Sequence, residues 1–144
     1  MRYYKDKLII VNSLSKQERD WLTPEGHGYR NAPDENMLYN VVAFEDYDKT
    51  RNPLGFIDIY KTSTPGEGMV LIAIHPKSRG KGLAKKLLSD AIKVNTKKKL
   101  FKQLIYAVDA DNKASNRLIQ HFDYDSKHTE MYNGHKQYVY TINF

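Results

Sequence analysis

Apolar residues follow two different periods along this chain, and the change between them divides the sequence in two. In the first half, short apolar runs separated by polar turns predict strands over residues 7–11, 37–44, 54–60 and 69–74. A brief helix is expected over residues 16–22. The last three of these strands follow one another with only turns between them, so we expect an antiparallel meander.

The second half opens with a helical period. Leu83, Leu87 and Ala91 recur on one face, which predicts a helix that runs out in the polar stretch 95–99. A strand over residues 104–108 and a second helix over residues 113–122 follow, and Asn133-Gly134 then predicts a hairpin between strands 124–132 and 136–144. The predicted fold class is therefore α+β: a single mixed, mostly antiparallel sheet flanked by helices, forming one domain over residues 1–144.

Composition narrows the possible chemistry. The 144 residues carry a net charge of +6 and include no cysteine, which excludes disulfides, thiolate nucleophiles and cysteine-bound zinc. The five histidines lack metal-ligand spacing, so no metal is expected. The apolar run over residues 8–11 is too short to span a membrane, which predicts a soluble, cytoplasmic protein. Positive charge favours anionic partners, and it leaves open both nucleic acid and a phosphorylated cofactor.

One strand–turn–helix segment carries the chemistry. Gly80 and Gly82 stand where the helix begins, beside Arg79 and Lys81. Unpaired amides and the positive end of the helix dipole make such a place suitable for a diphosphate-sized anion. The phosphate loop of nucleotide triphosphatases is absent, and Lys85 replaces the third glycine of the dinucleotide fingerprint. The alternative is that the glycines only shape a turn.

Two motifs resemble those of the GNAT N-acetyltransferase superfamily. The run from Arg79 to Ala84 matches the signature Arg/Gln-x-x-Gly-x-Gly/Ala, and the pattern Asn112-x-x-Ser115-x-x-Leu118 is similar to the second motif of the family. The predicted order of elements also follows that of the family over nearly the whole chain. The resemblance implies an acetyl-CoA-dependent N-acetyltransferase, acetyl-CoA being the cosubstrate.

The resemblance also implies which residues bind acetyl-CoA. The pantetheine arm would pair with the backbone at the end of strand 69–74. At this end, strand 69–74 would diverge from strand 104–108. The pyrophosphate would lie on the amides of the loop, and the second helix would reach the pantetheine. The implied cofactor-binding residues are Ile72, Ala73, Ile74, Arg79, Gly80, Lys81, Gly82, Leu83, Ala84, Asn112 and Ser115. Lys81, Lys85 or Lys86 would neutralise the 3′-phosphate.

Catalysis in this family is direct attack of a primary amine on the thioester in a ternary complex, so positioning supplies most of the rate. The tyrosine that usually protonates the leaving thiolate is replaced by Ile119, and the sequence offers no general acid. The usual positions of the base hold Gly68 and Val70, which leaves Glu67 and Asp58 as candidate catalytic residues. The alternative for each is a surface carboxylate.

Other functions stay open at this stage. A non-catalytic acyl-CoA-binding or sensor domain would explain the missing tyrosine, and a nucleic-acid-binding module would use the positive charge. The acceptor amine, on a small molecule or a protein, is expected to contact residues 21–34, with Tyr29, or the hairpin near Tyr132. The apolar alternation of residues 136–144 predicts an edge strand on which a homodimer could form.

Overall fold

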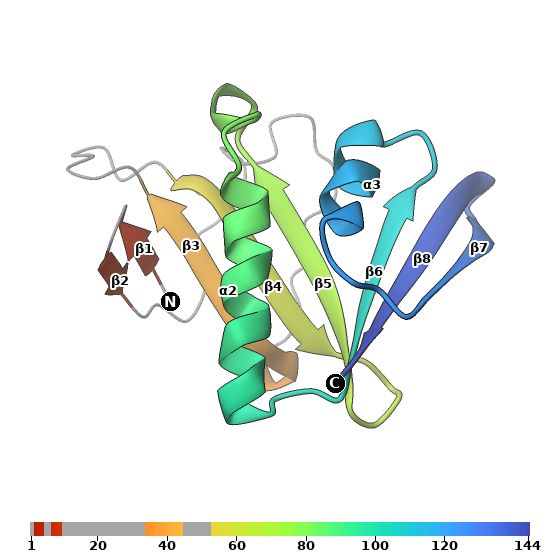
Figure 1. The fold of residues 1–144 in the computed structure, drawn as a ribbon, viewed down its shortest axis with the longest axis horizontal. Coiled ribbons are helices and arrows are strands. Elements are labelled where there is room, and N and C mark those ends of the chain that lie inside the picture. Colours follow the sequence, from red (N-terminus) through yellow and green to blue (C-terminus); the bar gives the residue numbers. More distant parts are fainter. Residues whose placement is uncertain (1, 5–6, 10–33, 45–52) are drawn as a thin grey trace.

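A computed structural model of the chain describes residues 2–4, 7–9, 34–44 and 53–144. Its described strands form one mixed sheet of eight strands, crossed on one face by helices (Figure 1). The strands are β1 (Arg2–Tyr4), β2 (Lys7–Ile9), β3 (Met37–Phe44), β4 (Pro53–Lys61), β5 (Glu67–Ile74), β6 (Gln103–Asp109), β7 (Ser126–Tyr132) and β8 (His135–Asn143). The helices are the 3₁₀ turns η1 (Asp34–Asn36) and η2 (Pro76–Ser78) and the α-helices α2 (Leu83–Lys98) and α3 (Lys113–Gln120).

The sheet has the order β2-β1-β3-β4-β5-β6-β8-β7. The expected meander is present, because β3, β4 and β5 pair antiparallel in sequence. α2 then crosses over the sheet, and β6 consequently pairs parallel to β5. The hairpin of β7 and β8 adds antiparallel to β6 through β8. Asn133 and Gly134 both have positive φ in its turn, as the sequence predicts.

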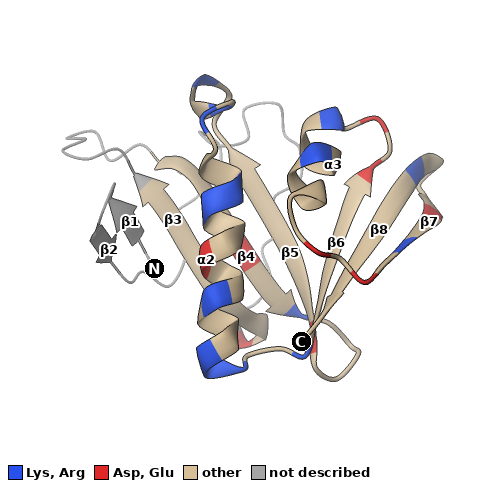
Figure 2. Cartoon of the chain, viewed as in Figure 1, with Lys and Arg blue, Asp and Glu red and all other residues tan. Residues whose placement is uncertain are grey.

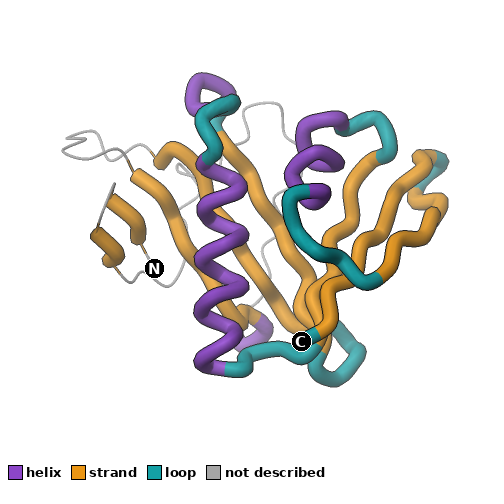
Figure 3. The backbone as a smooth tube through the Cα atoms, viewed as in Figure 1, coloured by secondary structure: helices purple, strands orange, loops and turns teal. Residues whose placement is uncertain are grey.

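The core lies between the sheet and the helix layer (Figure 3). Leu87, Leu88 and Ala91 of α2 are buried against Ile57 and Ile59 of β4. Alternate residues of a strand point to opposite faces, so this packing fixes which face each β4 side chain occupies. The predicted α+β fold with a mixed sheet is therefore confirmed.

One detail differs from the sequence prediction. β1 pairs parallel to β3, although its three residues carry too short a pattern to predict a strand. α2 ends at Lys98, within the polar stretch 95–99 where the sequence predicts its end. The Asn95 side chain is buried and links the end of α2 to the segment that follows. Its Nδ2 donates to the Phe101 carbonyl and its Oδ1 accepts from the Phe101 amide, both at 3.0 Å.

The prediction that the C-terminal strand forms an edge is wrong. β8 pairs with β6 on one side and with β7 on the other, so both of its edges are occupied. The edge at this end of the sheet is β7, all of whose side chains are exposed. The apolar alternation of β8 reflects burial within the sheet. The helix expected over residues 16–22 lies outside the described residues, as does the segment 21–34 up to residue 33.

Candidate functional site

β5 and β6 pair only at one end and then diverge. Both strands lie wholly within the described residues, and their ladder consists of Glu67 with Gln103, Gly68 with Leu104 and Met69 with Ile105. Beyond Met69 and Ile105 each strand continues without pairing to the other, and Figure 1 shows α3 lying over the opening. The divergence expected from the resemblance is therefore present.

The backbone of β5 is directed into this opening at alternate residues. The His75 amide donates to the Leu54 carbonyl at 2.8 Å, and the Glu67 carbonyl accepts from the Thr62 amide at 3.3 Å. Odd-numbered residues therefore bond toward β4, and the alternation of strand hydrogen bonds directs the even-numbered backbone groups toward β6. Ile72 and Ile74 are even-numbered and lie beyond the last bridge to β6.

The loop after β5 turns the chain from the sheet into α2. His75 caps η2 by accepting from the Lys77 amide at 3.2 Å, and burial lowers the pKa of its imidazole. Gly80 and Gly82 follow with φ of +77° and +78°, which favour glycine, and a Cβ at either would meet nothing within 4 Å. Gly82 is also the N-cap of α2 and makes no side-chain cap. The first turn of α2 thus begins beside open space.

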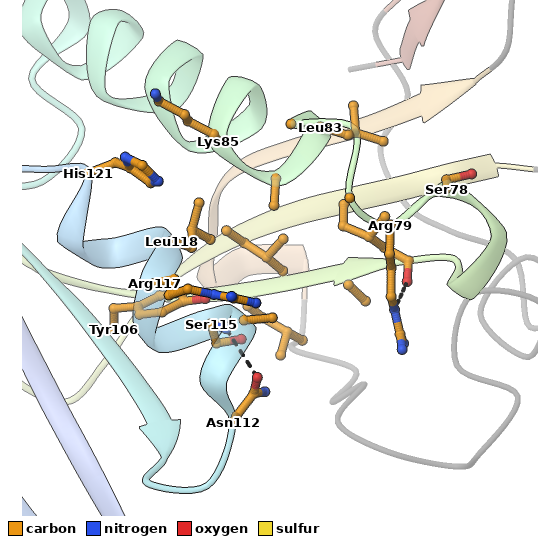
Figure 4. A pocket seen from close by; sticks show the side chains of 18 of the residues that line it. Ser78, Arg79, Leu83, Lys85, Tyr106, Asn112, Ser115, Arg117, Leu118 and His121 are labelled. Atoms are coloured by element: carbon orange, nitrogen blue, oxygen red, sulfur yellow. Dashed lines mark hydrogen bonds between the residues drawn. The ribbon is translucent and has the colours of Figure 1, made fainter.

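A cavity of about 900 Å³ joins the opening to this loop (Figure 4). Residues from β5, the loop, α2, β6 and α3 line it. They are Leu71, Ile72, Ala73, Ile74, Ser78, Arg79, Gly80, Gly82, Leu83, Ala84, Lys85, Tyr106, Asp109, Asn112, Ala114, Ser115, Arg117, Leu118 and His121. Of the residues expected to bind a cofactor, Lys81 alone is missing from this lining.

Basic groups dominate the charge around the cavity. Arg79, Lys85 and Arg117 line it, against the single carboxylate of Asp109. Figure 2 shows further basic residues on α2, all of them lysines. Lys86 forms an ion pair with Asp90 at 3.4 Å and does not line the cavity. The surplus of positive charge favours a polyanionic ligand.

Two hydrogen bonds give side chains of the lining additional roles. The Asn112 Oδ1 accepts from the Ser115 amide at 3.1 Å, which caps α3. The Arg79 Nε donates to the Ile74 carbonyl at 3.2 Å, so this guanidinium holds the loop against the end of β5. Asn112 and Arg79 therefore support the shape of the cavity as well as lining it.

Three lining residues carry functional groups that the sequence argument did not single out for the site. Arg117 and His121 come from α3, and Tyr106 comes from β6. Burial raises the pKa of the Tyr106 phenol, and the neighbouring Ser115 side chain opposes the rise. Ser115, Leu118 and His121 lie three residues apart, a helical spacing that is visible in the sequence, whereas Arg117 falls outside this spacing and Tyr106 reads only as one member of an apolar strand.

Asp58 is a buried carboxylate on the other face of the sheet. It lies between Ile57 and Ile59, which face α2, so its side chain points away from α2. It accepts a hydrogen bond from the Asn40 amide. Burial raises the pKa of Asp58 to about 6, although the bond from Asn40 opposes the rise. Its cross-strand neighbour is Leu71 of the cavity lining.

Glu67 lies at the closed end of β5 and does not line the cavity. Its Oε1 accepts from the Thr62 hydroxyl at 2.8 Å. Leu71, the cross-strand neighbour of Asp58, lies four residues beyond Glu67 along β5. At the usual rise of a strand, about 13 Å therefore separates Glu67 from the pair formed by Leu71 and Asp58. The structure therefore does not bring the two candidate carboxylates together.

The remaining candidates are dispersed. Ile119 is fully buried in the core, and Tyr132 is an exposed hairpin residue outside the cavity lining. Tyr29 lies outside the described residues. Among the described residues, His, Asp and Glu form no cluster that would hold a metal ion. Within that same part of the chain, no helix combines the length and apolarity that crossing a bilayer demands.

Comparison with known proteins identifies the fold. A model of the acetyltransferase (GNAT) domain matches residues 1–125. No protein of curated function matches the chain in sequence. A solved N-acetyltransferase from Staphylococcus aureus Mu50 is 25% identical with a TM-score of 0.53, over 67% of this chain and 64% of its own.

Two other solved structures extend the likeness. The ribosomal-protein-S5-alanine acetyltransferase of Vibrio fischeri is 16% identical with a TM-score of 0.55, over 65% of this chain and 56% of its own. A chimeric spermidine N-acetyltransferase from Vibrio cholerae is 19% identical with a TM-score of 0.54, over 67% of this chain and 62% of its own. The chain thus spans less than two thirds of the length of these structures.

Proposed function

The chain belongs to the GNAT acetyltransferase domain family, and from this we propose that it is an N-acetyltransferase that transfers the acetyl group of acetyl-CoA to a primary amine. The acceptor is a small molecule or an amine of a protein or peptide. The solved structures named for ribosomal protein S5 alanine and for spermidine share the fold, so the fold leaves the acceptor class open. We expect the protein to act in the cytoplasm. We also expect the transfer reaction to proceed without a metal ion.

The cavity between the diverging strands carries this proposal. Its shape and charge suit a long polyanionic ligand: an uncapped helix start and positive-φ glycines lie at one end, and strand backbone lies at the other. The pyrophosphate would accept hydrogen bonds from amides between Arg79 and Ala84. The pantetheine arm would then pair with Ile72 and Ile74 in place of β6, and Ser115 would reach it from α3.

Positioning supplies the main part of the proposed rate. The amine attacks the thioester carbonyl directly in a ternary complex, so no covalent intermediate with the protein forms. The Ile72 amide is the first even-numbered amide beyond those that pair with β6, so a backbone amide at this part of β5 would stabilise the oxyanion. Asp58 would accept the proton of the attacking amine from the opposite face of the sheet, because a pKa of about 6 leaves it ionised above neutrality.

A second candidate function is a non-catalytic acyl-CoA-binding or sensor domain. Ile119 favours it, because this residue is buried and provides no proton donor at the position where the family usually has tyrosine. The two functions share the cavity and differ in turnover. Release of free thiol from acetyl-CoA in the presence of an amine distinguishes them.

The experiment begins with binding. Titration of acetyl-CoA by calorimetry should give saturable binding, which Gly82→Glu should weaken at least about tenfold by placing a carboxylate where the pyrophosphate would lie. Gly134→Glu is the matched control, because Gly134 also has φ of +77° and open space around its Cβ, yet lies in the hairpin turn. Equal binding by both variants and the parent would refute the assignment.

A panel of amines then tests catalysis. We expect thiol release, followed with a thiol-reactive dye, for at least one class among polyamines, amino sugars and peptide amines. Asp58→Asn should lower that rate while acetyl-CoA affinity stays near that of the parent. Binding without release for every amine would favour the sensor function.

A further inference from the structure

The leaving thiolate needs a proton, and α3 does not provide it at the expected position. Ile119 is fully buried among apolar residues of the core. On the basis of the proposed function, we propose that the Tyr106 hydroxyl, presented from β6, donates the proton to the sulfur of coenzyme A. The donor thus comes from the sheet, and α3 contributes the residue that orients it.

Tyr106 occupies the point at which the two strands separate. It directly follows Ile105, the last residue of β6 that pairs with β5. Only 6% of its surface is exposed, yet it lines the cavity. A pantetheine arm that follows β5 from the loop toward the closed end must terminate near this position. The thioester would therefore lie within reach of a side chain at the point where β5 and β6 separate.

Ser115 is the neighbour that can orient the phenol, because both side chains line the same cavity. Ser115 is held in the first turn of α3, where its amide donates to the Asn112 cap. When the Ser115 hydroxyl donates to the phenol oxygen, the hydrogen of Tyr106 stays available for the cavity. Figure 4 shows the Tyr106 and Ser115 side chains on the same side of the cavity.

Other polar groups face the same cavity. The Asp109 carboxylate acts as an acceptor, and the guanidinium of Arg117 and the ammonium of Lys85 are suited to pair with phosphate. His121 is the rival donor, but it is exposed at the C-cap of α3, and Figure 4 shows it toward Lys85 of α2. Tyr106 is the buried donor among these groups, and Ser115, which also lines the cavity, is its neighbour.

The step balances in atoms and charge. The amine nitrogen forms a bond to the carbonyl carbon, and the C=O π pair moves to oxygen. Collapse of this intermediate re-forms C=O and breaks the C–S bond, and sulfur leaves with its electron pair. Sulfur takes the phenolic proton of Tyr106, while the nitrogen loses its surplus proton to Asp58. Tyr106 regains a proton from water through the half-buried Ser115 hydroxyl, and Asp58 returns its proton to water, so the cycle closes with no net proton uptake. The products are the acetylated amine and the thiol.

The titration of the phenol is consistent with this role. Burial raises the pKa of Tyr106 above its usual value, and the neighbouring Ser115 side chain opposes the rise. The side chain is therefore protonated at neutral pH when each cycle begins. A phenol that donates to a thiolate stabilises the anion even before transfer is complete.

The test uses coenzyme A itself, so it does not depend on the acceptor. The pKa of the bound thiol is measured from the ultraviolet absorbance of the thiolate, in the parent and in Tyr106→Phe. Loss of a hydrogen bond to a charged sulfur should raise that pKa by about one to two units. Tyr140→Phe is the matched control, because Tyr140 pairs with Tyr106 in register, is buried, and bonds to Asn116 outside the cavity at 2.8 Å.

The outcomes separate this inference from the proposed function. A raised thiol pKa in Tyr106→Phe, with the parent value in Tyr140→Phe, supports the donor. Ser115→Ala should give a smaller rise, because the phenol remains while its orienting partner is gone. If the parent binds coenzyme A and Tyr106→Phe leaves the thiol pKa unchanged, or both Phe variants shift it equally, Tyr106 is not the donor. If the parent binds no coenzyme A, the proposed function fails and the inference with it.

Discussion

Asp58→Asn should stabilise the fold at high pH while it lowers activity. Burial raises the Asp58 pKa from 3.8 to about 6, so the folded state binds this proton more tightly than the unfolded state does. The associated stability is present below about pH 4 and is lost as the pH rises through about 6. Asparagine does not ionise, and its Oδ1 can still accept from Asn40.

The magnitude follows from the size of the shift. The difference between 3.8 and about 6 is about 2.2 units, and at about 1.36 kcal/mol for each unit this is about 3 kcal/mol. Asp58 is 1% exposed, so solvent screening does not reduce this figure. Most of the effect develops between about pH 4 and pH 7. We therefore expect the variant to gain about 2 to 3 kcal/mol relative to the parent over that interval.

Urea denaturation of parent and variant at several values of pH measures this gain. The difference in unfolding free energy should grow with pH and then level off above neutrality. Asp123→Asn, at an exposed carboxylate, is the control and should show no such growth. If the gain of Asp58→Asn stays constant with pH, or shrinks as the pH rises, ionisation of the buried Asp58 carboxylate does not destabilise the folded state and the reasoning is refuted.

Three further predictions follow from packing and charge. Gly55→Ala should destabilise the fold by about 1–3 kcal/mol in urea, because its Cβ would lie 2.6 Å from Ile74 Cδ1 and 2.8 Å from the Ala73 carbonyl; wild-type stability would contradict this. Asn95→Ala should lower the melting temperature by removing both bonds to the Phe101 backbone and about 2–4 kcal/mol of stability, and an unchanged melting curve would count against it. Acetyl-CoA binding should weaken between low and high salt in calorimetry, whereas salt-independent affinity would exclude a role for the basic lining.

The two sequence motifs of this chain depend mainly on interactions between residues that are close in sequence. The glycine-rich loop and the Asn112 cap depend on backbone conformations that a few neighbouring residues determine. Gly80 and Gly82 take positive φ, and Asn112 accepts from Ser115 three residues later. The family and the cofactor-binding residues could therefore be proposed from the sequence. Lys81 was proposed with them and does not line the cavity, because a charged side chain beside a turn carries no pattern that fixes its direction.

The sequence by itself determined the order of strands and helices and the loop with its glycines, because period, turn residues and caps act within a few residues. Only the tertiary structure decided which residues far apart in the chain meet. It brought Tyr106 and Ser115 into the lining of one cavity, placed Asp58 on the face away from α2, and enclosed β8 between two strands. Such contacts depend on strand register and on the sheet face occupied, and a one-residue change in register would reverse them.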